Sequence, residues 1–269
     1  MNNLNYKTLK LEKQEAIARI TLITSPERKF PTLDMETGKE ILAAIEDCEK
    51  TEDIRVLIIT GTGKAFSAGG DIKKFKETIE AGKSGEFMDE LTKNLYQIAY
   101  KLKTLRIPVI AAVNGYAMGA GMNLVLSCDI IIAADSALFA ESFINLALIP
   151  GFAGTYYLPK LLPWPKVAEI CFFGENLSAA EMENLGLVNK VVPLEELESE
   201  VNKYAVKLAN QPTLAIGRMK KLFMDGFTKD FKTAIEAERQ IQVKSATTED
   251  YKEGVLALNE KRKPLFKGR

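Results

Sequence analysis

The alternation of hydrophobic and polar residues predicts two kinds of β-strand in this 269-residue chain. Near the N-terminus, residues 6–11 and 16–24 alternate and predict half-buried strands, joined by a polar turn at 12–15. Three later runs are almost continuously apolar, at 54–60, 108–113 and 129–133. Continuous β-branched runs of this length are typical of strands buried on both faces of a sheet.

Helical periodicity alternates with these buried strands and dominates after about residue 158. The expected helices lie at 34–49, 87–105, 122–127, 165–173, 178–185, 194–209, 212–225, 229–243 and 247–260. Asp34 is the expected N-cap of the first, and a short strand at 187–192 interrupts the C-terminal series. Because buried strand, glycine-rich turn and helix recur, we expect an α/β fold. We expect a core over residues 1–195 and a helical segment over 196–269.

The charge balance and the absence of histidine narrow the possible functions. Lys plus Arg and Asp plus Glu number 36 each, so no overall field argues for nucleic acid as a partner. With no histidine in the chain, Ser–His and Cys–His catalysis and histidine-ligated metals are excluded. Carboxylates, Tyr, Lys, Cys or water must therefore carry any proton transfer.

The cysteines and the apolar runs indicate the cellular compartment of the protein. Cys48, Cys128 and Cys171 are widely spaced, which is typical of reduced thiols and not of a metal or disulfide framework. The N-terminus has no apolar signal core, and no run reaches the ~18 apolar residues of a membrane helix. We therefore expect a cytoplasmic protein with no membrane partner.

The first glycine-rich turn, 61–71, follows a buried strand. Glycines let a backbone approach a ligand closely with its N–H groups unobstructed. A P-loop is not satisfied, because Gly63-Lys64 lacks the upstream glycine and the following hydroxyl. A tight strand-to-helix connection remains an alternative, and Asp71 is the expected cap of a helix beginning near Ile72.

The second turn, 115–121, superficially matches a dinucleotide-binding turn, with Tyr156 and Lys160 spaced as in short-chain dehydrogenases. That match is weak, since the turn lies in mid-chain and Pro159 interrupts the helix that should carry the lysine. Together the two turns make better chemical sense as an oxyanion hole, in which two backbone N–H groups converge on one oxygen. Residues 119–121 open a helix, whose N-terminus adds partial positive charge.

At these turns the chain resembles the enoyl-CoA hydratase/isomerase (crotonase) family. The matching stretches are 64–72, 108–121, 127–130, 148–150 with 154–155, 178–188, and 253–254 with 261–264. The resemblance implies a spiral of ββα turns with a C-terminal helical trimerisation layer. It further implies a homotrimer or homohexamer (a dimer of trimers) acting on an acyl-CoA, with coenzyme A as part of the substrate and neither a further cofactor nor a metal.

The resemblance also implies roles for individual residues. It places the two oxyanion donors at the amides of Gly70 and Ala120. The other expected substrate-binding positions are Ala68, Gly69, Asp71 and Ile72 along the coenzyme A path, and Arg28, Lys29 and Lys73 as phosphate partners, with solvated surface charge as the alternative for these basic residues.

The chain departs from the family where the hydratases carry their two glutamates. Those positions hold Asn123 and Phe143, which we still expect beside the substrate. Isomerases resembling the ring-opening epoxide and Δ3-enoyl-CoA types often carry an acid just after the Ile-Pro, and here that residue is Gly151. Without paired carboxylates no water is activated by an acid and a base, so standard hydration is disfavoured.

Glu141 is the remaining carboxylate candidate for catalysis. If 139–143 is extended, Phe139, Glu141 and Phe143 share a face. A carboxylate between two phenylalanines would be desolvated, which raises its pKa. A structural hydrogen-bonding role or a solvent-facing side chain is the alternative.

Four functions follow from this interpretation. The first hypothesis is isomerisation of an acyl-CoA through a thioester enolate. The second is hydration of a 2-enoyl-CoA by an unrecognised acid pair. Decarboxylation of a malonyl-type thioester also suits an oxyanion hole. The non-enzymatic alternative is a protein that binds acyl-CoA without catalysing a reaction.

Overall fold

A computed structural model describes residues 6–24 and 28–269 of the chain. The strands are β1 Leu9–Gln14, β2 Ile17–Leu22, β3 Val56–Gly61, β4 Ala65–Ser67, β5 Val109–Val113, β6 Tyr116–Met118, β7 Ile130–Ala134, β8 Leu138–Ala140, β9 Leu177–Ser178 and β10 Lys190–Val192. The α-helices are α1 Met35–Lys50, α2 Ile72–Glu80, α3 Ser84–Thr104, α4 Ala120–Leu126, α5 Gly154–Leu161, α6 Trp164–Phe173, α7 Ala179–Asn184, α8 Leu197–Ala209, α9 Thr213–Gly226, α10 Phe231–Ser245 and α11 Glu249–Asn259. Two short 3₁₀ helices, η1 Ser142–Leu146 and η2 Leu194–Glu196, complete the described elements.

These strands form two sheets. The larger sheet has the order β1-β2-β3-β5-β7-β10, and only its β1–β2 pair is antiparallel. The smaller sheet has the order β4-β6-β8-β9, in which β4, β6 and β8 run parallel and β9 antiparallel. Parallel strands with apolar faces on both sides explain the continuous hydrophobic runs.

The chain repeats one ββα unit. β3, β5 and β7 of the larger sheet lead directly into β4, β6 and β8 of the smaller sheet, and a helix follows each pair. The prediction of an α/β fold built from ββα turns is therefore confirmed. The three-residue strands β4 and β6 lie inside the two glycine-rich turns, where hydrophobic alternation is too short to reveal a strand.

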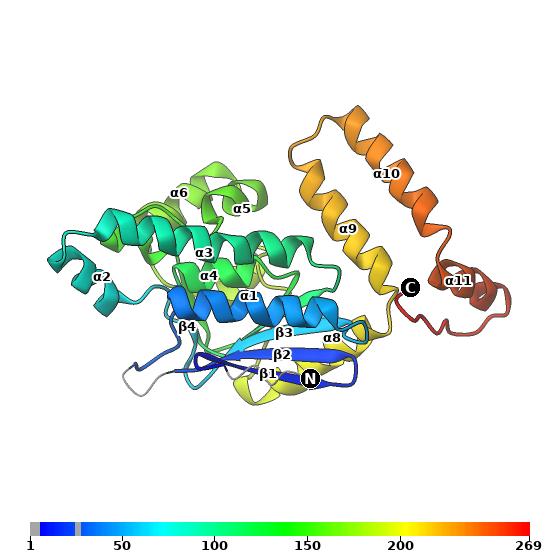
Figure 1. The fold of residues 1–269 in the computed structure, drawn as a ribbon, viewed down its shortest axis with the longest axis horizontal. Helices are drawn as coiled ribbons and strands as arrows, with labels where there is room; N and C mark the ends of the chain where they lie inside the picture. The colour runs from blue at the N-terminus through cyan, green and yellow to red at the C-terminus, as the bar shows by residue number, and fades with distance from the viewer. Residues whose placement is uncertain (1–5, 25–27) are drawn as a thin grey trace.

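Helices cover both faces of the larger sheet. α1 and α3 lie side by side on one face (Figure 1), and their buried residues join the larger apolar core. On the other face, α8 places Leu197, Val201 and Ala205 against the side chains of β3, β5 and β7. The division expected after residue 195 would separate α8 from the sheet that it covers, and it stays a prediction.

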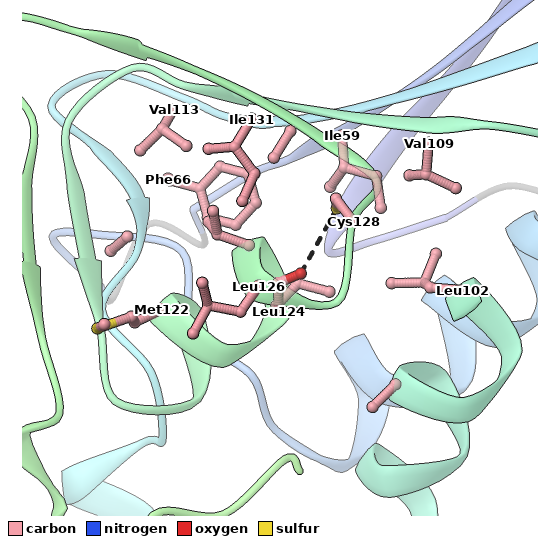
Figure 2. Packing of buried hydrophobic residues seen from close by; sticks show 14 of the residues in the cluster. Ile59, Phe66, Leu102, Val109, Val113, Met122, Leu124, Leu126, Cys128 and Ile131 are labelled. Atoms are coloured by element: carbon pink, nitrogen blue, oxygen red, sulfur yellow. Dashed lines mark hydrogen bonds between the residues drawn. The ribbon is translucent and has the colours of Figure 1, made fainter. Parts of the chain in front are cut away.

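The short helix α4 is buried along its whole length between the two sheets. Met122, Leu124 and Leu126 pack among apolar side chains of the sheets and of α3 (Figure 2), and the Cys128 thiol donates to the Leu124 carbonyl oxygen at 3.5 Å. The three cysteines are free. Because α4 has no exposed side, its N-terminal residues are held rigidly.

The helices α9 to α11 extend away from this core (Figure 1). A buried lysine of α9 fastens them: the Lys220 ammonium group donates to the carbonyl oxygens of Leu102 and Ile107 at 2.9 Å each and pairs with Asp129 at 2.6 Å. Over the described residues, no helix has the length and apolar character that crossing a membrane requires.

Two local predictions were wrong. The polar turn expected at 12–15 lies later, because β1 continues to Gln14 and the chain reverses at Glu15, where φ is 51°. The stretch 139–143 is not extended throughout, since β8 ends at Ala140 and η1 begins at Ser142. Phe139, Glu141 and Phe143 therefore do not share the face of a strand.

Candidate active site

The two glycine-rich turns meet at a cavity of about 290 Å³, which we call the glycine-turn cavity. It lies between α3, the end of the first turn, the start of α4, and the segment from η1 to the beginning of α5. Its walls are Leu33, Ala68, Gly69, Gly70, Ile72, Phe75, Met88, Leu91, Thr92, Leu95, Tyr96, Gly119, Ala120, Ser142, Phe143, Leu146, Leu148, Ile149, Gly151 and Phe152.

The first turn is fixed by backbone hydrogen bonds to the segment before α1. The Ala68 N–H donates to the Pro31 carbonyl at 2.8 Å, and the Leu33 N–H donates to the Gly69 carbonyl at 2.7 Å. Gly69 has a φ of +82°, and a Cβ there would lie 2.5 Å from the Met118 carbonyl oxygen. A glycine is therefore required where the first turn touches the second.

The second turn ends at the start of α4. Gly119 has a φ of +52°, and its N–H donates to the Ala140 carbonyl of β8 at 2.8 Å. Ala120 is the first residue of α4, so its N–H has no partner within the helix. The positive φ at Gly119 turns the chain so that α4 begins at the cavity wall.

Two backbone N–H groups are thus left free at the same cavity. Over residues 6–24 and 28–269, neither the Gly70 nor the Ala120 N–H donates a hydrogen bond to a protein group. Both residues line the glycine-turn cavity although they lie fifty positions apart in the sequence. Unpaired amides on the wall of an apolar cavity are the donors that an oxyanion needs.

The remaining walls carry hydroxyl groups but no charge. Thr92, Tyr96 and Ser142 are the polar side chains among the lining residues, and none of those residues is Asp, Glu, Lys or Arg. The Thr92 hydroxyl donates to the Met88 carbonyl at 2.8 Å. The sequence reasoning missed these three hydroxyls, because their position over the cavity depends on how α3 and η1 pack.

Asn123 and Glu141 lie together behind this wall. Both are fully buried, and neither is among the residues that line the glycine-turn cavity. Asn123 Nδ2 donates to the Gly151 carbonyl at 2.9 Å and to Glu141 Oε2 at 3.3 Å. In the described part of the chain, Asn123 Oδ1 and Glu141 Oε1 have no hydrogen-bond partner.

Burial makes Glu141 a weak acid. Desolvation raises the pKa of its carboxyl group from 4.5 to about 8, and the hydrogen bond from Asn123 offsets this only in part. The desolvation expected for Glu141 is therefore present, although Phe139, Glu141 and Phe143 do not share the face of a strand. The chain turns into η1 just after Glu141, so the carboxylate points toward Asn123 of α4 and not along a strand face.

The three basic residues that are expected to bind phosphate groups, Arg28, Lys29 and Lys73, have different surroundings. The Arg28 guanidinium pairs with Asp34 and Asp71 at 2.7 Å each, so two carboxylates already hold it. The Lys29 ammonium lies 5.3 Å from the centre of the Phe30 ring, and Lys73 is an exposed residue of α2.

The capping predictions at the first turn and at α1 are met by the contacts. Asp71 caps α2 by accepting from the N–H groups of Lys73 and Lys74, and Asp34 caps α1 through the Thr37 N–H.

Of the expected substrate-binding positions, Ala68, Gly69, Ile72 and Phe143 line the glycine-turn cavity, as do both expected oxyanion donors.

A metal site and a larger cavity are the alternatives to the glycine-turn cavity. No group of three or more carboxylates or cysteines over the described residues is arranged to hold a metal ion. A second cavity of about 430 Å³ lies between α9, α10 and α11, and it is remote from both glycine-rich turns. The glycine-turn cavity is therefore the candidate active site.

Known proteins of one family resemble this chain over most of its length. Residues 12–269 match the family model described as enoyl-CoA hydratase/isomerase. The chain is 36% identical to a probable mitochondrial enoyl-CoA hydratase of Dictyostelium discoideum, over 95% of this chain and 89% of that protein. It is 32% identical to 1,2-epoxyphenylacetyl-CoA isomerase of Escherichia coli, over 93% and 95%. A crystal structure titled as an enoyl-CoA hydratase subunit of Geobacillus kaustophilus superposes with a TM-score of 0.87 at 34% identity, covering 98% of this chain and 99% of that one.

Proposed function

Because this chain belongs to the enoyl-CoA hydratase/isomerase family and is an enzyme of that family, we propose that it isomerises an unsaturated acyl-CoA through a thioester enolate. The observation that carries the proposal concerns the described residues: the N–H groups of Gly70 and Ala120 have no partner among them, and none of those on the cavity wall is a carboxylate. An enolate needs such donors, whereas acid–base addition of water needs paired carboxylates beside the substrate.

In this proposal the thioester oxygen lies between the two amides. Removal of a proton from the α-carbon moves negative charge onto that oxygen, and the amides stabilise the charge because they are already oriented and shielded from water. Return of the proton at the γ-carbon shifts the double bond into conjugation with the thioester. One base suffices for both transfers, because it accepts a proton from the α-carbon and, after exchange of that proton with solvent, donates a proton to the γ-carbon.

Glu141 is our candidate for that base. Its carboxyl group contacts Asn123, three residues after Ala120, and its pKa of about 8 makes the ionised form a stronger base than an ordinary glutamate. The carboxylate lies behind the cavity wall, so the proposal requires the side chain to rotate away from Asn123 and toward the substrate.

The experiment supplies a 3-enoyl-CoA to the protein in D₂O and follows the conjugated-thioester absorbance together with the deuterium content of the product. We expect the 2-enoyl isomer with solvent deuterium incorporated. No conversion across chain lengths would contradict the proposal. Deuterium exchange that is unchanged by Glu141→Gln would eliminate that residue as the base.

Hydration of a 2-enoyl-CoA is the second candidate, and the names of several relatives favour it, among them a short-chain-enoyl-CoA hydratase of Clostridium acetobutylicum that is 35% identical to this chain. Crotonyl-CoA separates the two reactions. Hydration removes its conjugated-thioester absorbance, whereas an isomerase leaves the absorbance in place.

We also propose that the protein works as a homotrimer or homohexamer without a resident cofactor, coenzyme A entering with the substrate. Large apolar side chains on the projecting helices support the assembly: Phe223, Phe231 and Leu258 are 68%, 80% and 80% exposed. Light scattering should give three or six times the 29.8 kDa chain mass, and a monomer would contradict the proposal. A cytoplasmic location stays a prediction.

A further inference from the structure

Arg28 lies beside the first glycine-rich turn, and its guanidinium joins the N-caps of two helices. It pairs with Asp34 at the start of α1 and with Asp71 at the start of α2, at 2.7 Å each, and it donates to the Thr32 hydroxyl at 2.7 Å. The two carboxylates are 15% and 14% exposed, against 30% for the arginine. Water screens such partly buried pairs much less than surface pairs, so the three groups hold one another firmly.

The bridged residue Asp71 directly follows Gly70, one of the two proposed oxyanion donors. On the other side of Gly70, the backbone of the turn is held by the hydrogen bond from the Leu33 N–H to the Gly69 carbonyl at 2.7 Å. On the Asp71 side, the ion pair with Arg28 ties the turn to the same preceding segment. The direction of the Gly70 N–H therefore depends on both attachments.

The two helices that share the guanidinium differ in how firmly they are packed. α1 buries six residues, among them Ile41 and Ile45 of the apolar core. In α2, every residue of which the structure describes, Thr78 alone is buried. The Phe75 ring of α2 also lies against the donor, since a Cβ at Gly70 would be 2.6 Å from its Cζ atom. Without the guanidinium the two capping carboxylates would repel each other, and α2 would move together with the turn before it.

We propose that Arg28 is a positioning residue of the oxyanion hole: by bridging Asp34 and Asp71, it fixes the direction of the Gly70 N–H. The inference rests on the proposed function and adds to it a residue that does not touch the substrate. It also gives Arg28 a role different from the phosphate contact that the family resemblance suggests. One cation between two carboxylates leaves a net negative charge, which does not attract a phosphate group.

The test compares three quantities in the wild type and in Arg28→Gln: the absorbance of bound cinnamoyl-CoA, kcat for a 3-enoyl-CoA, and the affinity for free coenzyme A. The cinnamoyl band moves to longer wavelength when the thioester oxygen accepts hydrogen bonds, so it reports on the donors without turnover. Arg28→Gln should reduce this shift and lower kcat by about 10- to 100-fold, the cost of displacing an active-site group by about 1 Å. The affinity for free coenzyme A should stay within about twofold, because the variant removes no contact with it.

Two further variants separate positioning from a general loss of structure. Arg28→Lys should restore part of the spectral shift, because it keeps the charge but lacks the planar fork that reaches both carboxylates. Asp71→Asn keeps a side chain that can cap α2 and removes the repulsion from Asp34. Added to Arg28→Gln, it should lower kcat no further, whereas two independent losses that multiply would overturn the inference.

Arg262→Gln is the matched control. Arg262 also bridges two carboxylates, those of Glu253 and Glu260, but it follows α11 on the projecting helices (Figure 1) and does not line the glycine-turn cavity. It should leave the spectrum and kcat unchanged. A spectral shift that Arg28→Gln leaves as in the wild type, or a loss of coenzyme A affinity alone, would overturn the inference while leaving the proposed function standing. A wild-type protein that shifts the cinnamoyl band but converts no 3-enoyl-CoA would overturn the proposed isomerisation instead.

Discussion

The buried carboxyl group of Glu141 predicts an unusual dependence of stability on pH. Its side chain is fully buried, and the Asn123 amide is the donor that it contacts, at 3.3 Å. The pKa is about 8 in the folded protein, against an ordinary value of 4.5. Between these two values the folded state holds a proton that the unfolded state has released. The stability associated with the neutral carboxyl group is therefore complete below pH 4.5 and is lost as the pH rises toward 8.

The size of this effect follows from the shift. Each pH unit inside the window costs about 1.4 kcal/mol, so raising the pH from 5 to 9 should cost the wild type about 4 kcal/mol through this one group. Glu141→Gln has nearly the same shape, can still accept from Asn123 and carries no charge at any pH. The variant should therefore gain about 4 kcal/mol relative to the wild type between pH 5 and pH 9.

Urea unfolding of both proteins at pH 5, 7 and 9, at one fixed protein concentration, measures this difference. Contributions of all other titrating groups are common to the two proteins and cancel in the comparison. Parallel pH dependences of the two free energies of unfolding would refute the reasoning, because they would mean that Glu141 is solvated or paired with a cation in the folded protein.

Three further predictions concern the oxyanion hole, the C-terminal helices and the reaction. Ala120→Pro removes one proposed donor at the first position of a helix, where proline is tolerated. It should lower kcat by about 100- to 1,000-fold and leave the circular dichroism spectrum unchanged. A loss in kcat of less than about tenfold would contradict the donor's role. Lys220→Met leaves Asp129 without its partner and should lower the free energy of unfolding in urea by about 3–5 kcal/mol, whereas a change under about 1 kcal/mol would show that this ion pair does not fasten α9. If Glu141 is the base, kcat/KM for isomerisation should rise with pH and level off above about 8, since only the ionised carboxylate accepts a proton; a flat profile from pH 6 to 9 would count against it.

The parts of the fold that could be predicted are those with long, regular patterns. The buried run 54–60 becomes β3, and Asp34 caps α1 as its position before the helical pattern predicts. The three-residue strands β4 and β6 could not be predicted from periodicity, because two or three residues do not establish a period of two. They form because pairing between the two glycine-rich turns satisfies backbone groups that would otherwise be buried unpaired.

The candidate site also has parts that the sequence predicts and parts that it does not. The family resemblance places the expected oxyanion donors at the amides of Gly70 and Ala120, and both residues line the glycine-turn cavity. The side chains around them could not be placed from the sequence, since the direction of Glu141 changes with the backbone turn at Ser142. The position of Tyr96 on the cavity wall could not be predicted either, because its contact with Gly151 depends on how α3 packs in the fold.

A crystal structure with an unreactive acyl-CoA analogue bound would test the central claim most directly. The measured quantities are the distances from the thioester oxygen to the backbone nitrogen atoms of Gly70 and Ala120. We predict that both are about 3 Å, with the acyl chain in the glycine-turn cavity. A thioester oxygen hydrogen-bonded to neither amide, or an acyl group bound outside this cavity, would contradict the account.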